Sequence, residues 1–212
     1  MNKPPIPPHL MMRKQPKQLR TRKLIETIFA STSALVIERG FAAVNTNAIA
    51  KHANVDITSL YQFFPNKEAI LYAIADRWLE HVRAVCQRFQ EEAYQALDWR
   101  AFFLRLNHEV NTIPEHGTHY ASLSTLWETL PEFAELERYH QQWIVAFLCG
   151  ELRRFGATAP AQTLQERVLY LYLSTDGIAE VMGTYPEPTA SALRQLQYQT
   201  WEYHLAPLLD KQ

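Results

Sequence analysis

The chain has 212 residues, of which 47% are hydrophobic and 20% are charged, and its formal net charge is −1. This composition excludes a disordered chain and a uniformly basic nucleic-acid coat, and the length is enough to bury a hydrophobic core without a stapling disulfide or metal. Only six residues are glycine, roughly 3% against a usual ~7%, which argues against an all-β fold.

The two cysteines, Cys86 and Cys149, form no CxxC pair. Their spacing is typical of a reducing compartment and indicates neither a zinc knuckle nor a disulfide framework. No stretch approaches the ~18 apolar residues of a membrane span, and the first residues lack the apolar core of a signal peptide. We therefore expect a cytoplasmic protein with no membrane contact.

Charge is distributed unevenly along the chain. Residues 1–67 contain ten Lys or Arg and three acidic residues, a net charge of +7, so the remainder carries −8. A basic first third on an acidic remainder suggests a nucleic-acid-binding domain followed by a domain with another task. Charge alone leaves open a basic tail on a neutral domain.

The first 20 residues hold five prolines and scattered basic residues without apolar periodicity. This pattern predicts a flexible arm of extended character. Apolar residues then recur at helical spacing from Leu24 to Val36, and Gly40 supplies the expected stop. We predict a first helix of about four turns.

Two short helices follow. Asn45 can cap a helix that ends near Asn54, and Asp56 can cap a third helix that runs through Phe64, before the break at Pro65. Two short helices joined by three or four residues make a helix-turn-helix. We place this DNA-binding domain at residues 21–66.

The rest of the chain, residues 67–212, is predicted to be helical and interrupted at prolines. The expected helices lie near 67–95, 98–112, 118–130, 132–155, 161–183 and 188–209. The fold class is therefore all-α, with a three-helix N-terminal helix-turn-helix domain, a helical C-terminal domain, and about nine helices.

The third predicted helix has two faces. Placed at 100° per residue, Leu60, Phe63 and Phe64 share one arc that faces a core. The opposite arc carries a polar surface with one aromatic hydroxyl, formed by Ile57, Thr58, Ser59, Tyr61 and Gln62. This surface either enters a major groove or is the solvated face of a core helix.

The residue types on that arc suit DNA. Thr58 and Gln62 can form hydrogen bonds with base edges, and Ile57 can contact a thymine methyl. The hydroxyl of Tyr61 and the cation of Lys67 are better suited to phosphate.

These segments resemble the N-terminal DNA-binding domain of the TetR family of bacterial transcriptional regulators. The resemblance covers about 50 residues, from Arg22 to Leu71. It is carried by Gly40-Phe41, Asn45-Thr46-Asn47-Ala48-Ile49-Ala50, Ala53-Asn54-Val55-Asp56, Leu60-Tyr61-Gln62-Phe63-Phe64 and Asn66-Lys67-Glu68. Three positions depart from the family pattern: Ala48 replaces an acid, Asn54 a glycine and Asp56 a small hydroxyl residue.

The resemblance implies a role for each matching residue. Phosphate contacts are implied for Thr46, Tyr61 and Lys67. Base or groove contacts are implied for Asn47, Thr58, Ser59 and Gln62, and we expect Asn47 and Thr58 to dominate specificity. It also implies a variable C-terminal domain that binds a small molecule and forms a homodimer through its last two helices.

The last two predicted helices each carry a wide apolar stripe, which is typical of a four-helix dimer interface and also of an intramolecular core. The residues of the first stripe are Leu164, Val168, Leu171, Tyr172, Thr175, Ile178, Ala179 and Met182. Those of the second are Leu193, Leu196, Thr200, His204 and Leu208, flanked by Trp201 and Leu205.

The middle helices are rich in aromatic residues, which either line an apolar effector pocket or fill a core. The candidate ligand-binding aromatics are Trp78, Phe103, Trp127, Tyr139 and Trp143. The candidate polar groups among them are His108, His140 and Asp176. The eight histidines form no HExxH or paired-carboxylate pattern, so we predict no metal and no cofactor.

The sequence carries no GxSxG, Walker or GxGxxG motif, and we predict that the protein is not an enzyme. The expected function is a DNA-binding transcriptional regulator, a repressor released from double-stranded operator DNA by an apolar or aromatic small molecule. The alternative is a DNA-binding adaptor whose acidic C-terminal domain engages a protein partner without a small-molecule switch.

Overall fold

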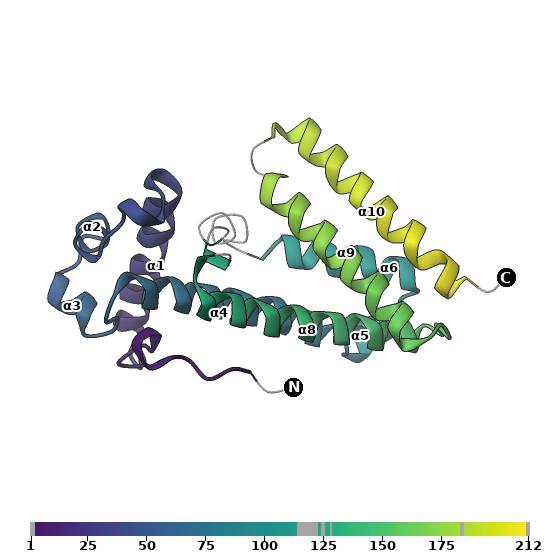
Figure 1. Ribbon diagram of the computed structural model, residues 1–212, viewed down its shortest axis with the longest axis horizontal. Coiled ribbons are helices and arrows are strands. Elements are labelled where there is room, and N and C mark those ends of the chain that lie inside the picture. The colour runs from purple at the N-terminus through teal and green to yellow at the C-terminus, as the bar shows by residue number, and fades with distance from the viewer. Residues whose placement is uncertain (1–2, 114–122, 124–125, 128, 183–184, 211–212) are drawn as a thin grey trace. The chain divides into compact units, whose positions relative to one another are not determined.

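The computed structural model describes residues 3–113, 123, 126–127, 129–182 and 185–210, without the side chains of 176–177 and 179–182. Within these residues the chain is all-helical, with nine α-helices and two short 3₁₀ segments (Figure 1). The predicted fold class is confirmed.

The chain divides into two compact units. The head unit comprises residues up to Glu80 together with 118–137, and the body unit comprises 81–117 and 138–212. The division falls inside two long helices, α4 (Lys67–Arg88) and α8 (Pro131–Arg154). The N-terminal part of each helix belongs to the head unit and the C-terminal part to the body unit.

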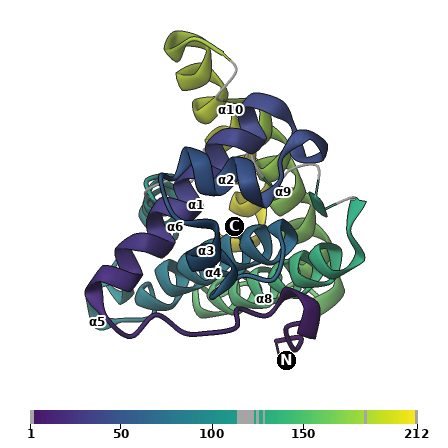
Figure 2. The ribbon, with the colours of Figure 1, turned by 90° about the vertical axis from the view of Figure 1, so that its left-hand side faces the viewer.

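The head unit contains the predicted helix-turn-helix. Helix α1 spans Leu19–Arg39, α2 spans Thr46–His52 and α3 spans Ile57–Tyr61. Helix α2 contacts both α1 and α3 (Figure 2). Helix α3 ends at Tyr61 rather than at Phe64, because the backbone N–H groups of Phe63 and Phe64 both bond the carbonyl of Leu60 in a closing turn.

Side-chain caps begin the short helices as the sequence predicts. The Oδ1 atom of Asn45 accepts the N–H of Ala48 at 2.9 Å, and that of Asp56 accepts the N–H of Thr58 at 2.8 Å. Asn66 caps α4 in the same way through the N–H of Ala69 at 2.7 Å. Each cap satisfies a helical N–H that has no partner within its own helix.

Two residues with positive φ link the head helices. Gly40 ends α1 with φ 77°, and Asn54 lies between α2 and α3 with φ 52°. Asparagine tolerates the left-handed region better than most residues, so Asn54 makes the turn that glycine makes in the family pattern.

The inner faces of the head helices form one apolar core. Ile28, Ile49, Leu60 and Phe64 are fully buried, and Phe63 is nearly so. The predicted inward arc of the third helix is therefore confirmed. Its burial fixes which residues of α3 face outward.

The first residues differ from the expected flexible arm. They form a 3₁₀ turn, η1 (Pro8–Leu10), whose Leu10 side chain is buried. The Nδ2 atom of Asn66 donates to the carbonyl of His9 at 3.0 Å, and the ammonium of Lys3 pairs with Asp76 at 2.6 Å. Prolines keep the segment extended, and Leu10 docks it on the head unit.

The body unit holds the C-terminal parts of α4 and α8 and four further helices. These are α5 (Glu92–Gln95), α6 (Trp99–Asn111), α9 (Ala161–Met182) and α10 (Glu187–Leu209). The helix predicted over 67–95 ends earlier, at Arg88. The chain turns there, and the rings of Phe89 and Tyr94 stack with their centroids 4.2 Å apart. Most of the helix predicted over 118–130 lies outside the described residues.

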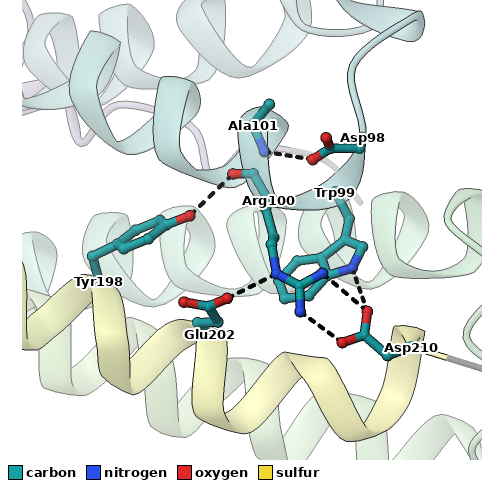
Figure 3. A network of polar contacts seen from close by, with 7 residues as sticks. All are labelled: Asp98, Trp99, Arg100, Ala101, Tyr198, Glu202 and Asp210. Carbon is teal, nitrogen blue, oxygen red and sulfur yellow. Dashed lines mark hydrogen bonds and ion pairs between the residues drawn. The ribbon is translucent and has the colours of Figure 1, made fainter.

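A polar network fastens α6 to the end of α10 (Figure 3). The guanidinium of Arg100 donates to Glu202 at 2.7 Å and to Asp210 at 2.6 and 3.1 Å. The indole N–H of Trp99 donates to the same Asp210 carboxylate at 3.0 Å. Bonds from Arg100 and Trp99 hold the pKa of Asp210 below its usual range, so this carboxylate stays ionised at neutral pH.

No described helix is long and apolar enough to cross a membrane. In the same part of the chain, no group of three or more His, Cys, Asp or Glu side chains is arranged to hold a metal ion.

Candidate nucleic-acid interface

The outward side of α2 and α3 presents polar side chains to solvent. Asn47, Thr58, Tyr61 and Gln62 are exposed, while their neighbours Thr46, Ile57 and Ser59 are half-buried. All seven are sequence-predicted contact residues, and the buried core behind them leaves this polar side free to meet DNA. The two helices therefore hold hydrogen-bond donors and acceptors at the surface on a rigid backbone.

Two of the predicted phosphate contacts are joined to one another. The hydroxyl oxygens of Thr46, at the start of α2, and Tyr61, at the end of α3, lie 2.8 Å apart. One hydroxyl donates to the other, and the pair still has one hydrogen and several lone pairs to offer. The pair therefore orders two helix ends at a single point of the surface.

Lys67 has internal partners that the sequence analysis did not anticipate. Its ammonium donates to the carbonyls of Phe41 and Val44 at 2.8 Å each, and it lies 4.0 Å from the centre of the Phe41 ring. Two of its three N–H donors are thus used within the head unit, and one remains for a phosphate. Lys67 holds the connection between α1 and α2 in addition to its proposed DNA contact.

Arg13 contacts the end of α3, and sequence reasoning missed it. Its guanidinium donates to the carbonyl of Tyr61 at 2.9 Å, and its backbone N–H donates to the carbonyl of Phe63 at 2.9 Å. Carbonyls at a helix C-terminus lack intrahelical partners and attract positive charge. Arg13 therefore caps the helix that carries the exposed polar residues.

Asp56 brings a negative charge to this surface. Its carboxylate accepts the Thr58 N–H, and hydrogen bonds from Thr58 hold the pKa of Asp56 below its usual range. The charge is placed at the N-terminus of α3, where the helix dipole favours an anion. The departure from the family pattern thus keeps the cap.

Comparisons with known proteins agree with this geometry. The family model described as "Bacterial regulatory proteins, tetR family" matches residues 28–74, which cover the helix-turn-helix and the start of α4. A curated relative from Haemophilus influenzae, described as an uncharacterized HTH-type transcriptional regulator, is 26% identical over 154 residues, or 70% of this chain and 76% of the relative. The head unit of this chain carries the DNA-binding domain of the TetR family.

Several solved structures, two of them described as TetR-family regulators, share the fold. A TetR-family regulator from Streptomyces coelicolor is 22% identical, with a TM-score of 0.56, and the match covers 88% of this chain and 99% of that one. GusR from Salmonella enterica is 18% identical with a TM-score of 0.70, over 93% and 100% of the two chains. A TetR-family regulator from Haemophilus influenzae is 19% identical with a TM-score of 0.61, over 86% and 98%.

With a TetR-family DNA-binding domain, this protein is a DNA-binding transcriptional regulator. Members of the family are regulators rather than enzymes, which agrees with the lack of a catalytic motif in the sequence. TetR-family regulators bind operator DNA and are typically dimeric.

The predicted ligand-binding residues of this TetR-family protein fall in different places. Trp78 is buried in the head unit, where Trp127 also lies with its ring 6.0 Å from that of Phe133. His108 is exposed on α6. The side chain of Asp176 lies outside the described residues.

Six of the predicted ligand-binding residues, including His108 and Asp176, belong to the body unit. Phe103 is buried in an aromatic cluster, with its ring 5.8 Å from that of Trp201. Tyr139 and Trp143 are half-buried one turn apart on α8, and His140 between them is buried. The body unit thus gathers two partly accessible aromatics and one buried histidine on one helix.

Proposed function

We propose that this TetR-family regulator is a homodimeric repressor that leaves a pseudo-palindromic operator when an apolar or aromatic small molecule binds the body unit. The DNA-binding part of this proposal rests on the exposed polar side chains of α2 and α3, which lie over a fully buried core. The cytoplasm is its proposed location, because the two cysteines, Cys86 and Cys149, are free thiols.

The roles at the DNA follow from exposure and chemistry. Asn47 and Thr58 are exposed near the N-termini of α2 and α3, so we assign them to base edges in the major groove. Gln62, Ser59 and Ile57 supply further groove contacts. Thr46, Tyr61 and Lys67 bind phosphate and fix the register of the head on the duplex.

Exposed apolar side chains on the last two helices support a dimer interface. On α9, Tyr170 and Leu173 are each 52% exposed, and on α10 Leu196 is 57% and Tyr203 77% exposed. Helices α9 and α10 pack against each other in the body unit (Figure 1), where the indole N–H of Trp201 donates to the hydroxyl of Thr175 at 3.0 Å. The side chains left outside that packing suit a second copy of the chain, which would complete a four-helix interface.

The proposed effector site centres on α8. Tyr139 and Trp143 are half-buried, and the Trp143 ring lies parallel to that of Phe147 with centroids 5.6 Å apart. Partly accessible aromatic rings bind apolar ligands with little loss of side-chain entropy. Phe103 is part of a closed cluster and His108 is exposed, so both contribute less to this proposal.

The first experiment identifies the operator by selecting genomic fragments that the purified full chain binds. A hydrophobic and aromatic compound library is then screened for release of the labelled fragment, and each hit is repeated with Trp143→Ala. We expect a pseudo-palindromic site with half-sites about one helical turn apart, and hits that lose potency in the variant. If no compound class releases the fragment while protein partners bind the body unit, the adaptor alternative replaces the repressor.

A further inference from the structure

Arg83 is a buried cation in the body unit. It lies on the C-terminal part of α4 and is only 7% exposed, and its Nη1 atom is 3.2 Å from Nδ1 of His140 on α8, which is 3% exposed. The guanidinium also lies 5.3 Å from the centre of the Tyr139 ring. Within the described residues, no carboxylate bonds to Arg83.

The hydrogen bond between the two side chains fixes their roles. A guanidinium only donates, so Nδ1 of His140 is the acceptor and its Nε2 carries the proton. Burial, together with the neighbouring Arg83 charge, lowers the pKa of His140 to about 3, so the ring is neutral at physiological pH. Arg83 therefore keeps several N–H donors, and the described part of the body unit supplies them with no acceptor other than His140.

The charge of Arg83 is not offset by the buried acid of the same unit. Glu151 is 5% exposed, but its Oε2 atom already pairs with Nε of Arg154 at 2.6 Å. That pair is neutral, so among the described side chains Arg83 remains as an extra buried positive charge. A buried charge without a counter-ion is costly, and an anion bound beside it would offset that cost.

We propose that Arg83 and His140 form a binding site for the anionic group of the effector, with a carboxylate as the favoured form. The planar guanidinium matches a carboxylate through two parallel hydrogen bonds, and His140, by accepting a hydrogen bond from Nη1, holds the guanidinium in place. This inference rests on the proposed ligand-controlled function and names its ligand class.

The surroundings of the pair indicate what the anion is attached to. The ring of Tyr139 lies under the guanidinium, and the ring of Tyr172 is centred 6.4 Å from that of His140. Trp143 follows one turn later on the same helix. A carboxylate at Arg83 would therefore have aromatic neighbours for its apolar part, and the effector is an amphiphilic organic acid with an aromatic or aliphatic body.

The test measures binding to the full chain without DNA by isothermal titration calorimetry. The probes are benzoate and 2-naphthoate, each with its neutral amide, and 2-naphthyl phosphate to separate a carboxylate from a phosphate site. We expect at least one acid to bind tenfold or more tightly than its amide. Equal binding of every acid and its amide would overturn the proposal.

Two variants test whether Arg83 causes the preference for the acid over its amide. Arg83→Met keeps the length and removes the charge, so the acid preference should fall at least tenfold. Arg88→Met is the matched control, because Arg88 lies on the same helix, is exposed and pairs with Glu109 at 3.0 Å. An acid preference that survives in Arg83→Met would show that the anion binds elsewhere.

Stability separates a binding role from a structural one. Since Arg83 has no anionic partner in the described residues, Arg83→Met should melt at the same temperature as the wild type or higher, and 2-naphthoate should raise only the wild-type melting temperature. A variant that unfolds at room temperature would show that Arg83 is structural. Arg83→Lys keeps the charge but removes the planar pair of N–H donors. Unchanged acid binding in this variant would overturn the bidentate site.

A final arm separates this site from the proposed switch. Acids that bind the wild type through Arg83 but leave the selected DNA fragment bound would support the site and contradict the switch. Acids that release DNA equally from wild type and Arg83→Met would support the switch and overturn the site.

Discussion

The hydroxyl groups of Thr46 and Tyr61 lie 2.8 Å apart and join the start of α2 to the end of α3. Asn47 directly follows Thr46, and Gln62 directly follows Tyr61, so the bond lies beside two exposed residues of the proposed groove surface. Because the two hydroxyls restrain each other, the side chains of the proposed groove surface around them would meet DNA in a preset geometry. Less side-chain entropy is then lost on binding.

Specificity should depend on Asn47 and Thr58. Asn47→Ala or Thr58→Ala should cost roughly 1–3 kcal/mol of binding free energy on the operator and little on random DNA, because base-edge bonds are lost and phosphate contacts stay. Lys67→Ala should weaken both duplexes alike. It should also lower the stability of the head, because the carbonyls of Phe41 and Val44 lose their donor. Fluorescence anisotropy on both duplexes measures this, and equal losses for all three variants would contradict it.

Sequence predicts those features that depend on residues close together in the chain. Asn45, Asp56 and Asn66 cap helices through residues two or three positions ahead, so short-range patterns were enough to predict the three starts. The docking of Leu10 and the capping of α3 by Arg13 join segments some 50 residues apart. Hydrophobic periodicity in the sequence does not predict such contacts.

Arg83 shows the same limit within the body unit. On sequence it follows Glu80 and His81 and resembles part of a charged, solvated helix face. Its burial depends on packing between α4 and α8, whose facing residues are separated by 57 positions in the chain. The neighbouring Val82 and Val85 are buried apolar residues, and nothing in the sequence shows that a guanidinium is buried between them.

Arg13 should strengthen DNA binding by ordering α3. Arg13→Ala removes the guanidinium bond to the carbonyl of Tyr61, so we expect the free energy of unfolding to fall by about 0.5–1.5 kcal/mol and operator binding to weaken. Lys17→Ala is the control, since Lys17 is exposed in the same segment. Urea unfolding and anisotropy measure the two effects. Identical results for both variants would show that Arg13 acts only through its charge.

The basic residues after Arg13 should set the salt dependence of binding. Lys14, Lys17 and Arg20 are exposed, and each phosphate that they neutralise adds about 0.9 to the slope of log K against log salt. Replacing all three by Gln should flatten the slope and keep the fold. Deleting residues 1–18 is the poorer test, because it also removes the buried Leu10. An unchanged slope in the triple variant would show that these cations do not reach DNA.

The proposed dimer interface predicts a change of mass. Leu196→Glu together with Tyr203→Glu places two charges on side chains already exposed in the single chain, so the protomer should fold and the dimer should dissociate. Leu104→Glu, on α6 and 51% exposed, is the matched control. Sedimentation equilibrium reports the mass. A dimer that survives the double substitution would place the interface elsewhere.

His140 should make the protein less stable in acid. Burial lowers its pKa from 6.5 to about 3, so below pH 6.5 the unfolded chain binds a proton that the folded chain does not. The free energy of unfolding therefore falls as the pH drops from 7 towards 3, and the part due to His140 between pH 7 and 5 is about 2 kcal/mol.

His140→Gln keeps an acceptor for Arg83 and cannot titrate, so it should lose that much less stability over the same interval. Urea unfolding at pH 7, 6 and 5 gives the difference, and His81→Gln, on the exposed side of α4, is the control. Parallel pH curves for wild type and His140→Gln would mean that the ring is charged or solvated in the folded protein, and the donor assignment at the Arg83 site would fall with it.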